Sequence, residues 1–143
     1  MAGKCKSSTK TKGYKMKIEH IAIWVIDLEI MRSFYETYFN AVSGEKYVNP
    51  IKKFSSYFLS FKEGARLEIM HKPSINTPSN SEVISTGYVH MAISVGTIEK
   101  VNSLTEQLRF KGYTISGEPR TTGDGYYESV ILDPEGNQIE ITI

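Results

Sequence analysis

The chain repeats itself at an offset of about 70 residues, and such a repeat indicates a fold assembled from two similar units. His20 begins an apolar run, HIAIW, and His90 begins a second run, HMAIS, 70 residues later. Each run is followed by a segment with helical spacing of its apolar residues, which starts at Asp27 in the first copy and at Thr97 in the second. Both are good N-cap residues. The spacing therefore predicts a strand followed by a helix in each half.

A closer match follows the helices. The segments FKEGARLEI at 61–69 and DPEGNQIEI at 133–141 share the pattern Glu-Gly-x-x-(Leu/Ile)-Glu-Ile. Each has a strand-like run on both sides of the Glu-Gly turn, which predicts a hairpin in which glycine adopts the backbone angles of the turn. The short runs at 44–49 and 113–119 are the predicted second strands of the two halves.

We therefore predict an α+β fold made of two paired βαβββ modules that form an open, curved mixed sheet. Residues 1–15 are rich in Lys, Ser, Thr and Gly, which predicts a disordered basic leader. Residues 16–143 are predicted to form one domain, with module one at 16–72, a Pro- and Ser-containing linker at 73–87 and module two at 88–143.

Composition excludes several classes of function. The net charge is +1, so no basic surplus points to nucleic acid, and no apolar run is long enough to cross a bilayer. Cys5 is the single cysteine, which leaves no disulfide framework and no thiolate metal site. The leader lacks the apolar segment of a signal peptide, so we expect a cytoplasmic protein whose partner is a small molecule.

Strand alternation places two histidines and two glutamates on one side of the predicted sheet. The Ile, Leu and Val residues of each strand must lie under the helices, so the opposite face carries His20, Glu68, His90 and Glu140. A lone strand His or Glu is more often structural or solvated than a ligand. Two matched pairs change that balance, because carboxylates brought together without a cation are costly. The sequence predicts a cavity that holds one divalent ion such as Zn, Ni, Co, Mn or Fe(II).

Four segments carry a family resemblance: KIEHIAIWVIDLEIMRSFYETYF, GARLEIM, YVHMAISV and DPEGNQIEI. They resemble the signature segments of the glyoxalase/bleomycin-resistance/dioxygenase group, also called the vicinal oxygen chelate superfamily. The resemblance covers nearly all of 16–143 and is most specific at the Asp-Pro-Glu-Gly ending. It implies paired βαβββ modules around an open sheet and assembly into a homodimer.

Ligand order separates the members of this group. The His, Glu, His, Glu order is similar to that of glyoxalase I (lactoylglutathione lyase), with methylmalonyl-CoA epimerase as the second match. A non-catalytic binding protein for a drug or metabolite is the alternative from another class. Glutathione-using glyoxalase I enzymes typically carry an Arg and an Asn at two places where this chain has Trp24 and Lys72. The resemblance therefore leaves the thiol cosubstrate open.

The predicted ligand set suits proton transfer next to a carbonyl, because a Lewis acid stabilises the enediolate that forms. Glu140, or Glu68 of the other half, is the expected base. Returning the proton to the neighbouring carbon gives isomerisation of a 2-oxoaldehyde–thiol adduct, and returning it to the same carbon gives epimerisation. Trp24, Arg120 and Tyr127 are candidate substrate-binding residues. The sequence does not decide whether the site lies within one chain or between two.

Overall fold

Two similar modules follow each other along the chain, in a computed structural model that describes residues 16–80 and 86–143. The predicted leader at 1–15 and the middle of the linker lie outside the described residues. None of the described helices is long and apolar enough to span a membrane. Module one contains β1 (His20–Trp24), α1 (Leu28–Phe39), β2 (Val42–Ser43), β3 (Tyr47–Asn49), β4 (Phe54–Ser60) and β5 (Arg66–His71), and module two contains β6 (His90–Ser94), α2 (Ile98–Phe110), β7 (Ile115–Thr121), β8 (Tyr127–Leu132) and β9 (Gln138–Thr142).

The helix starts are where the sequence predicts them. The side chain of Asp27 accepts hydrogen bonds from the backbone N–H groups of Glu29 and Ile30, and that of Thr97 accepts from Lys100. These bonds satisfy donors that have no partner inside a helix. An apolar stripe then faces the sheet in each helix, with Met31, Phe34 and Tyr35 buried in α1 and Val101 and Leu108 buried in α2.

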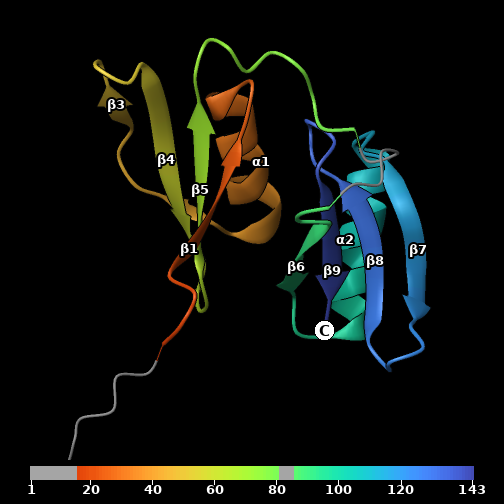
Figure 1. Cartoon of the computed structure of the whole chain (residues 1–143). Helices are drawn as coiled ribbons and strands as arrows, with labels where there is room; N and C mark the ends of the chain where they lie inside the picture. The colour runs from red at the N-terminus through yellow and green to blue at the C-terminus, as the bar shows by residue number, and fades with distance from the viewer. Residues whose placement is uncertain (1–15, 81–85) are drawn as a thin grey trace, which may run out of the picture.

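Each module forms its own mixed sheet. The strand order is β1-β5-β4-β2 in module one, where β3 also pairs with β4, and β6-β9-β8-β7 in module two. β1 runs parallel to β5 and β6 runs parallel to β9, while the later strands are antiparallel. Figure 1 shows the two sheets as separate units joined by the linker. This confirms the α+β class and the paired βαβββ modules, with two open sheets in the chain.

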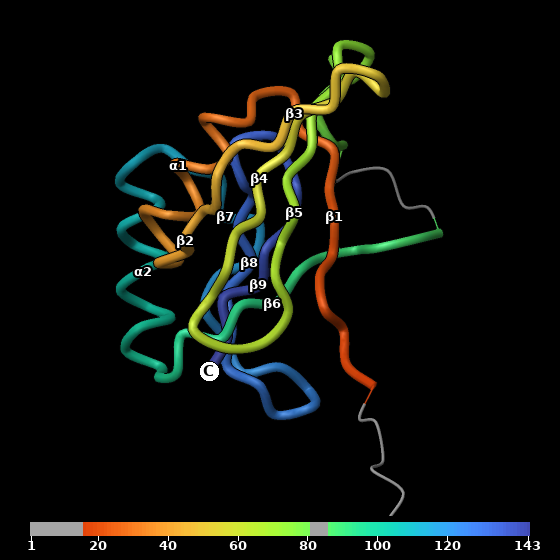
Figure 2. Tube along the Cα trace, turned by 90° about the vertical axis from the view of Figure 1, so that its left-hand side faces the viewer, coloured from red at the N-terminus to blue at the C-terminus, as the bar shows by residue number. Residues whose placement is uncertain are grey.

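The helices lie on the apolar side of the sheets. α1 packs on β4 and β5, and α2 packs on β7, β8 and β9. Figure 2 shows both helices on one side of the molecule. One cluster of buried apolar residues includes members of both modules, among them Leu67 and Ile69 of β5 and Ile139 and Ile141 of β9. The opposite faces of β5 and β9 are thereby left open, as alternation requires.

A polar latch joins the modules at one end. The Glu135 carboxylate, in the β8–β9 turn, accepts hydrogen bonds from the backbone N–H of Ile26 (2.7 and 2.9 Å) and of Asp27 (2.7 Å). The hydroxyl of the fully buried Tyr35 donates to Asp133 Oδ2 at 3.2 Å. The turn that precedes β9 is therefore held against the turn that follows β1. We call these contacts the inter-module latch.

Candidate metal centre

The predicted donors form two His–Glu pairs with the same register. Ala22 of β1 lies opposite Glu68 of β5, and Ala92 of β6 lies opposite Glu140 of β9. In both modules the histidine therefore lies two residues before the alanine that faces the glutamate. His20 Nε2 is 3.9 Å from Glu68 Oε2, and His90 Nε2 is 3.1 Å from Glu140 Oε2. Parallel pairing of the first and last strands of each module thus creates each pair.

The surroundings of His20 fix the imidazole. The Glu19 carboxylate bonds to His20 Nδ1, which leaves Nε2 directed to Glu68. Arg66 holds the other oxygen of Glu19 at 2.6 and 2.8 Å. The hydrogen bond from His20, followed by the contacts with Arg66, lowers the pKa of Glu19, although burial opposes this. A carboxylate on the second ring nitrogen is the usual way to orient a ligating imidazole.

Phe58 packs against the first His–Glu pair. Its ring meets the His20 ring edge to face, with centroids 5.2 Å apart, and the Arg66 guanidinium lies 4.1 Å from the centroid of Phe58. Phe58 is also in register with Glu68, so it lies on the same open face. The aromatic ring limits the imidazole to a small range of orientations.

The second pair has different neighbours. Val89 precedes His90, so module two has no carboxylate at the position that corresponds to Glu19. Val130 of β8 is in register with Glu140 and lies beside it on the open face. Two places away along β8, Glu128 interacts with Arg120 of β7 at 3.4 Å. The predicted substrate contact Arg120 thus lies on the same face as Glu140 and has a carboxylate partner.

Within one chain the four donors remain two pairs. Residues 16–80 and 86–143 contain no group of three or more His, Cys, Asp or Glu side chains placed to hold one ion. A site with all four predicted ligands therefore requires the two pairs to lie closer together than they do within this chain. β1 and β6 are each the terminal strand in the hydrogen-bonded order of their sheet, so each pair lies at a sheet edge.

The donor chemistry fits a divalent cation. Each pair offers one imidazole nitrogen and one carboxylate oxygen from neighbouring strands, and all four side chains are partly accessible, with 13–40% of their area exposed. Two such pairs provide the mixed nitrogen and oxygen ligands that Zn, Ni, Co, Mn and Fe(II) accept. The fit supports the predicted ligands His20, Glu68, His90 and Glu140, whose role stays a prediction.

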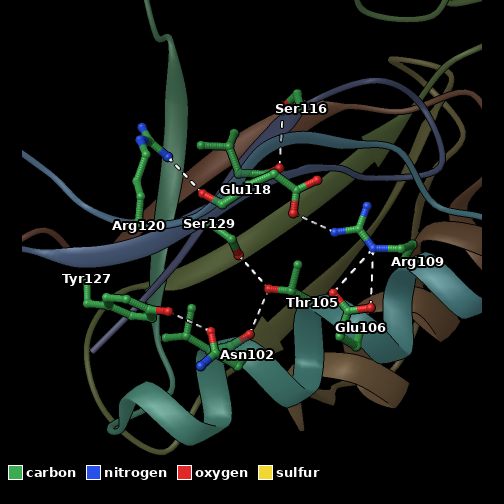
Figure 3. A network of polar contacts seen from close by, with 11 residues as sticks. Asn102, Thr105, Glu106, Arg109, Ser116, Glu118, Arg120, Tyr127 and Ser129 are labelled. Atoms are coloured by element: carbon green, nitrogen blue, oxygen red, sulfur yellow. Dashed lines mark hydrogen bonds and ion pairs between the residues drawn. The ribbon is translucent and has the colours of Figure 1, made fainter.

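The other two candidate substrate residues lie on opposite faces. Trp24 is on the open face of β1, with 45% of its surface exposed. Tyr127 is on the helix-covered face of β8, where its hydroxyl donates to Asn102 of α2 at 2.8 Å (Figure 3). Ser129, on the same side of β8, bonds to the buried hydroxyl of Thr105. Tyr127 therefore braces α2 against the sheet in this arrangement.

Glu19 and Phe58 contact the first pair but were not among the residues predicted from the sequence. A signal for Glu19 was available, because a carboxylate directly precedes His20 and has no counterpart before His90. Phe58 had no such signal, since its contact with His20 depends on the register of β4 against β5. Side chains that touch a candidate ligand through sheet register are set by long-range pairing.

Sequence comparison agrees with the motifs. Residues 17–141 match the family model described as "Glyoxalase/Bleomycin resistance protein/Dioxygenase superfamily". The chain is also 26% identical over 127 residues to the uncharacterized protein YqjT of Bacillus subtilis. The aligned region covers 87% of this chain and 96% of that protein.

Solved structures share the fold. Glyoxalase I from Zea mays has 25% identity and a TM-score of 0.72 over 88% of this chain. The matched part is 44% of the maize chain, so this chain spans less than half of that enzyme. The trypanothione-dependent glyoxalase I of Leishmania major has 22% identity and a TM-score of 0.72, with 90% of this chain and 86% of that chain covered. A glyoxalase/bleomycin resistance/dioxygenase domain from Frankia reaches a TM-score of 0.77 at 14% identity.

Proposed function

Because the chain belongs to the glyoxalase/bleomycin resistance protein/dioxygenase superfamily, we propose that it is a metal-dependent lyase of the glyoxalase I type. Its substrate would be a 2-oxoaldehyde–thiol adduct or a similar small carbonyl compound. The observation that carries this proposal is the repeated His–Glu pairing, His20 with Glu68 and His90 with Glu140, in identical register on two open sheet faces.

We further propose that a second copy of the chain completes the site. A pair alone offers two protein donors, whereas catalytic sites for these metals use three or more. β1 and β6 are terminal strands in their sheets, and such edges are available for association with another chain. Placing β1 of one copy beside β6 of the other brings one pair from each together. A symmetric dimer then contains two such sites.

His20, Glu68, His90 and Glu140 would hold a divalent ion, which would supply Lewis-acid stabilisation of negative charge on the substrate carbonyl oxygen. Glu140 takes the proton from the adjacent carbon, because a positioned carboxylate is a suitable general base. Its Oε2 lies 3.1 Å from His90 Nε2, so the carboxylate stands beside the other proposed ligand of its pair. Glu68, 3.9 Å from His20, remains the alternative base. Return of the proton to the neighbouring carbon completes the isomerisation.

Metal content tests the ligand set first. Protein purified without chelator should contain about one divalent ion per chain, and His90→Ala should reduce this severalfold. His71→Gln is the matched control, because the His71 Nδ1 bonds to the backbone carbonyl of Val25, away from the open face. The proposal is wrong if wild-type protein lacks a near-stoichiometric metal, or if both variants keep it equally.

Mixing inactive variants tests the shared site. His20→Ala and His90→Ala should each be inactive, but a mixed dimer contains one site with all four donors intact. Co-refolding the two variants should therefore restore up to about a quarter of the wild-type activity. A site formed within one chain would show no recovery.

Turnover tests the reaction. We expect thioester absorbance to increase when the protein meets methylglyoxal and a thiol, and Glu140→Gln should reduce the rate by about 100-fold or more. A variant that keeps full activity would exclude Glu140 as the base. Exchange of solvent deuterium into a 2-substituted acyl-CoA, without thioester formation from methylglyoxal, would assign the protein to epimerases instead.

A further inference from the structure

A groove between the two modules lies outside the candidate metal centre. The end of α1, the β4–β5 turn, β6 and the first half of α2 line it, and its volume is about 1020 Å³. None of the four proposed metal ligands is among the lining residues. Figure 1 shows the β4–β5 turn and the start of α2 at the same, lower end of the two modules. A groove of this size can hold a small organic molecule.

The inter-module latch has no counterpart at this end. The internal repeat places Thr105 where α1 has Tyr35, and Phe61 where the β8–β9 turn has Asp133. The Thr105 hydroxyl bonds to Ser129 inside module two. Among residues 16–80 and 86–143, no hydrogen bond at this end therefore corresponds to the one between Tyr35 and Asp133. The smaller threonine side chain leaves open the space that a tyrosine ring would fill.

Two cations are specific to this end of the molecule. Lys62 and Lys100 both line the groove. The repeat has Pro134 and Ile30 at the corresponding positions of the latched end. Within the part of the chain that the structure describes, neither lysine ammonium takes part in a hydrogen bond or an ion pair. Both ammonium groups can therefore bond to an anion in the groove.

The remaining charges of the groove set the charge of that anion. Arg66 also lines the groove, but Glu19 neutralises it at 2.6 Å. Glu63 is the one acidic residue of the lining, and its side chain is exposed. Two free ammonium groups and one carboxylate leave a single positive charge, which favours a singly charged carboxylate over a doubly charged phosphate.

Apolar side chains that are continuous with the core form the rest of the surface. They are only partly buried, so they offer apolar area that a ligand could remove from water: Tyr38, Phe61, Met91, Ile93, Val95 and Leu104. They come from both modules. The methionine thioether can also adjust its shape to a ligand.

We infer that this groove binds an amphiphilic carboxylate, whose apolar chain lies between the modules and whose head group is held by Lys62 and Lys100. The ligand would join the modules at the end that has no latch of its own. The inference goes beyond the proposed function, because it requires neither a metal ion nor turnover.

Calorimetric titration with two probes tests the chemistry of the ligand. Decanoate and 1-decanol have the same apolar chain and differ in the charge of the head group. Wild-type protein, titrated with each probe below the concentration at which it forms micelles or separates, should bind decanoate about tenfold more tightly, as one charge-assisted contact allows. Absence of binding, or equal affinity for the two probes, would overturn the inference.

Substitution of the lysines identifies the charges that are responsible. The double variant Lys62→Met/Lys100→Met should weaken binding of decanoate about tenfold and leave binding of 1-decanol within about twofold. Lys52→Met/Lys111→Met is the matched control, because it removes two exposed cations that do not line the groove, and it should change neither affinity. A carboxylate bound elsewhere, for example at a metal ion, would keep its preference in the first variant, and that result would refute the site.

A bulky side chain tests the position of the apolar chain. Ser103 is exposed on α2 and lines the groove, so Ser103→Trp should fill part of the groove and weaken binding of both probes about tenfold or more. Glu106→Trp places the same ring on an exposed position of α2 outside the groove and should leave both affinities unchanged. Wild-type affinities in Ser103→Trp would exclude this groove as the binding site.

Discussion

Replacement of Glu135 by alanine should destabilise the protein by removing the charged half of the inter-module latch. The carboxylate accepts from two backbone N–H groups, those of Ile26 and Asp27, at 2.7–2.9 Å. Hydrogen bonds to a charged group contribute about 1.5–3 kcal/mol each. The Ile26 amide is half-buried, but Asp27 is exposed and its amide can bond to water instead. We therefore expect a loss of about 2 kcal/mol, below the full sum.

Urea unfolding monitored by Trp24 fluorescence and by far-ultraviolet circular dichroism measures this loss. The expected decrease in the free energy of unfolding corresponds to a melting temperature lower by about 6 °C. The internal repeat supplies the control, because Glu63 occupies the same place in the β4–β5 turn as Glu135 does in the β8–β9 turn. Glu63 is exposed and makes none of the side-chain hydrogen bonds or ion pairs found among the described residues.

Glu63→Ala should therefore change stability by less than about 0.5 kcal/mol. Equal losses for the two alanine variants would refute the latch, because Glu63 has no contact of this kind among the described residues. A loss below about 0.5 kcal/mol for Glu135→Ala would refute it as well.

Two further predictions concern the same turn. Gly136→Ala should lower the free energy of unfolding by at least about 1 kcal/mol more than Gly64→Ala does. Both glycines have positive φ (87° and 89°), but only at Gly136 would a Cβ lie 2.6 Å from the Ser79 carbonyl oxygen. Thermal unfolding compares the two variants, and equal losses of stability would contradict this steric clash. Burial raises the pKa of Asp133. Just above the ordinary aspartate pKa the native chain therefore binds more protons than the unfolded chain. The free energy of unfolding should then fall as the pH rises through the raised pKa of Asp133. Asp133→Asn should remove that fall in urea titrations at several pH values, and an unchanged slope would assign it to another group.

Local features of the fold could be predicted from the sequence. Asp27 and Thr97 begin the helices because their side chains bond to the first free N–H groups, which is a short-range effect. Gly64 and Gly136 mark the hairpin turns because both have a left-handed backbone. Alternation placed each histidine on the open face for an equally local reason.

The arrangement of the modules could not be predicted in the same way. Repeat symmetry suggested that the two halves share one site but left open whether those halves belong to one chain, and in this chain the two His–Glu pairs lie at the edges of two separate sheets. The packing between modules depends on contacts across more than 90 residues, such as Tyr35 with Asp133. Those contacts have no periodic signal in the sequence.

Tyr127 shows a related limit. It begins β8, next to Glu128, so the face it occupies depends on the register of β8 with β9. A one-residue slip of that register would have turned it to the open face. The observed register gives its hydroxyl to Asn102 instead.

The parallel pairing of β1 with β5 and of β6 with β9 has a consequence for folding. Each histidine joins its sheet through a partner strand that lies more than 40 residues further along the chain. Closing a loop of that length is entropically costly and slow compared with forming a helix or a hairpin. The contact between each histidine and its glutamate should therefore be among the last to form as each module folds. During synthesis, imidazoles that leave the ribosome early would stay without their carboxylates, so capture of an ion would be delayed until each module is complete.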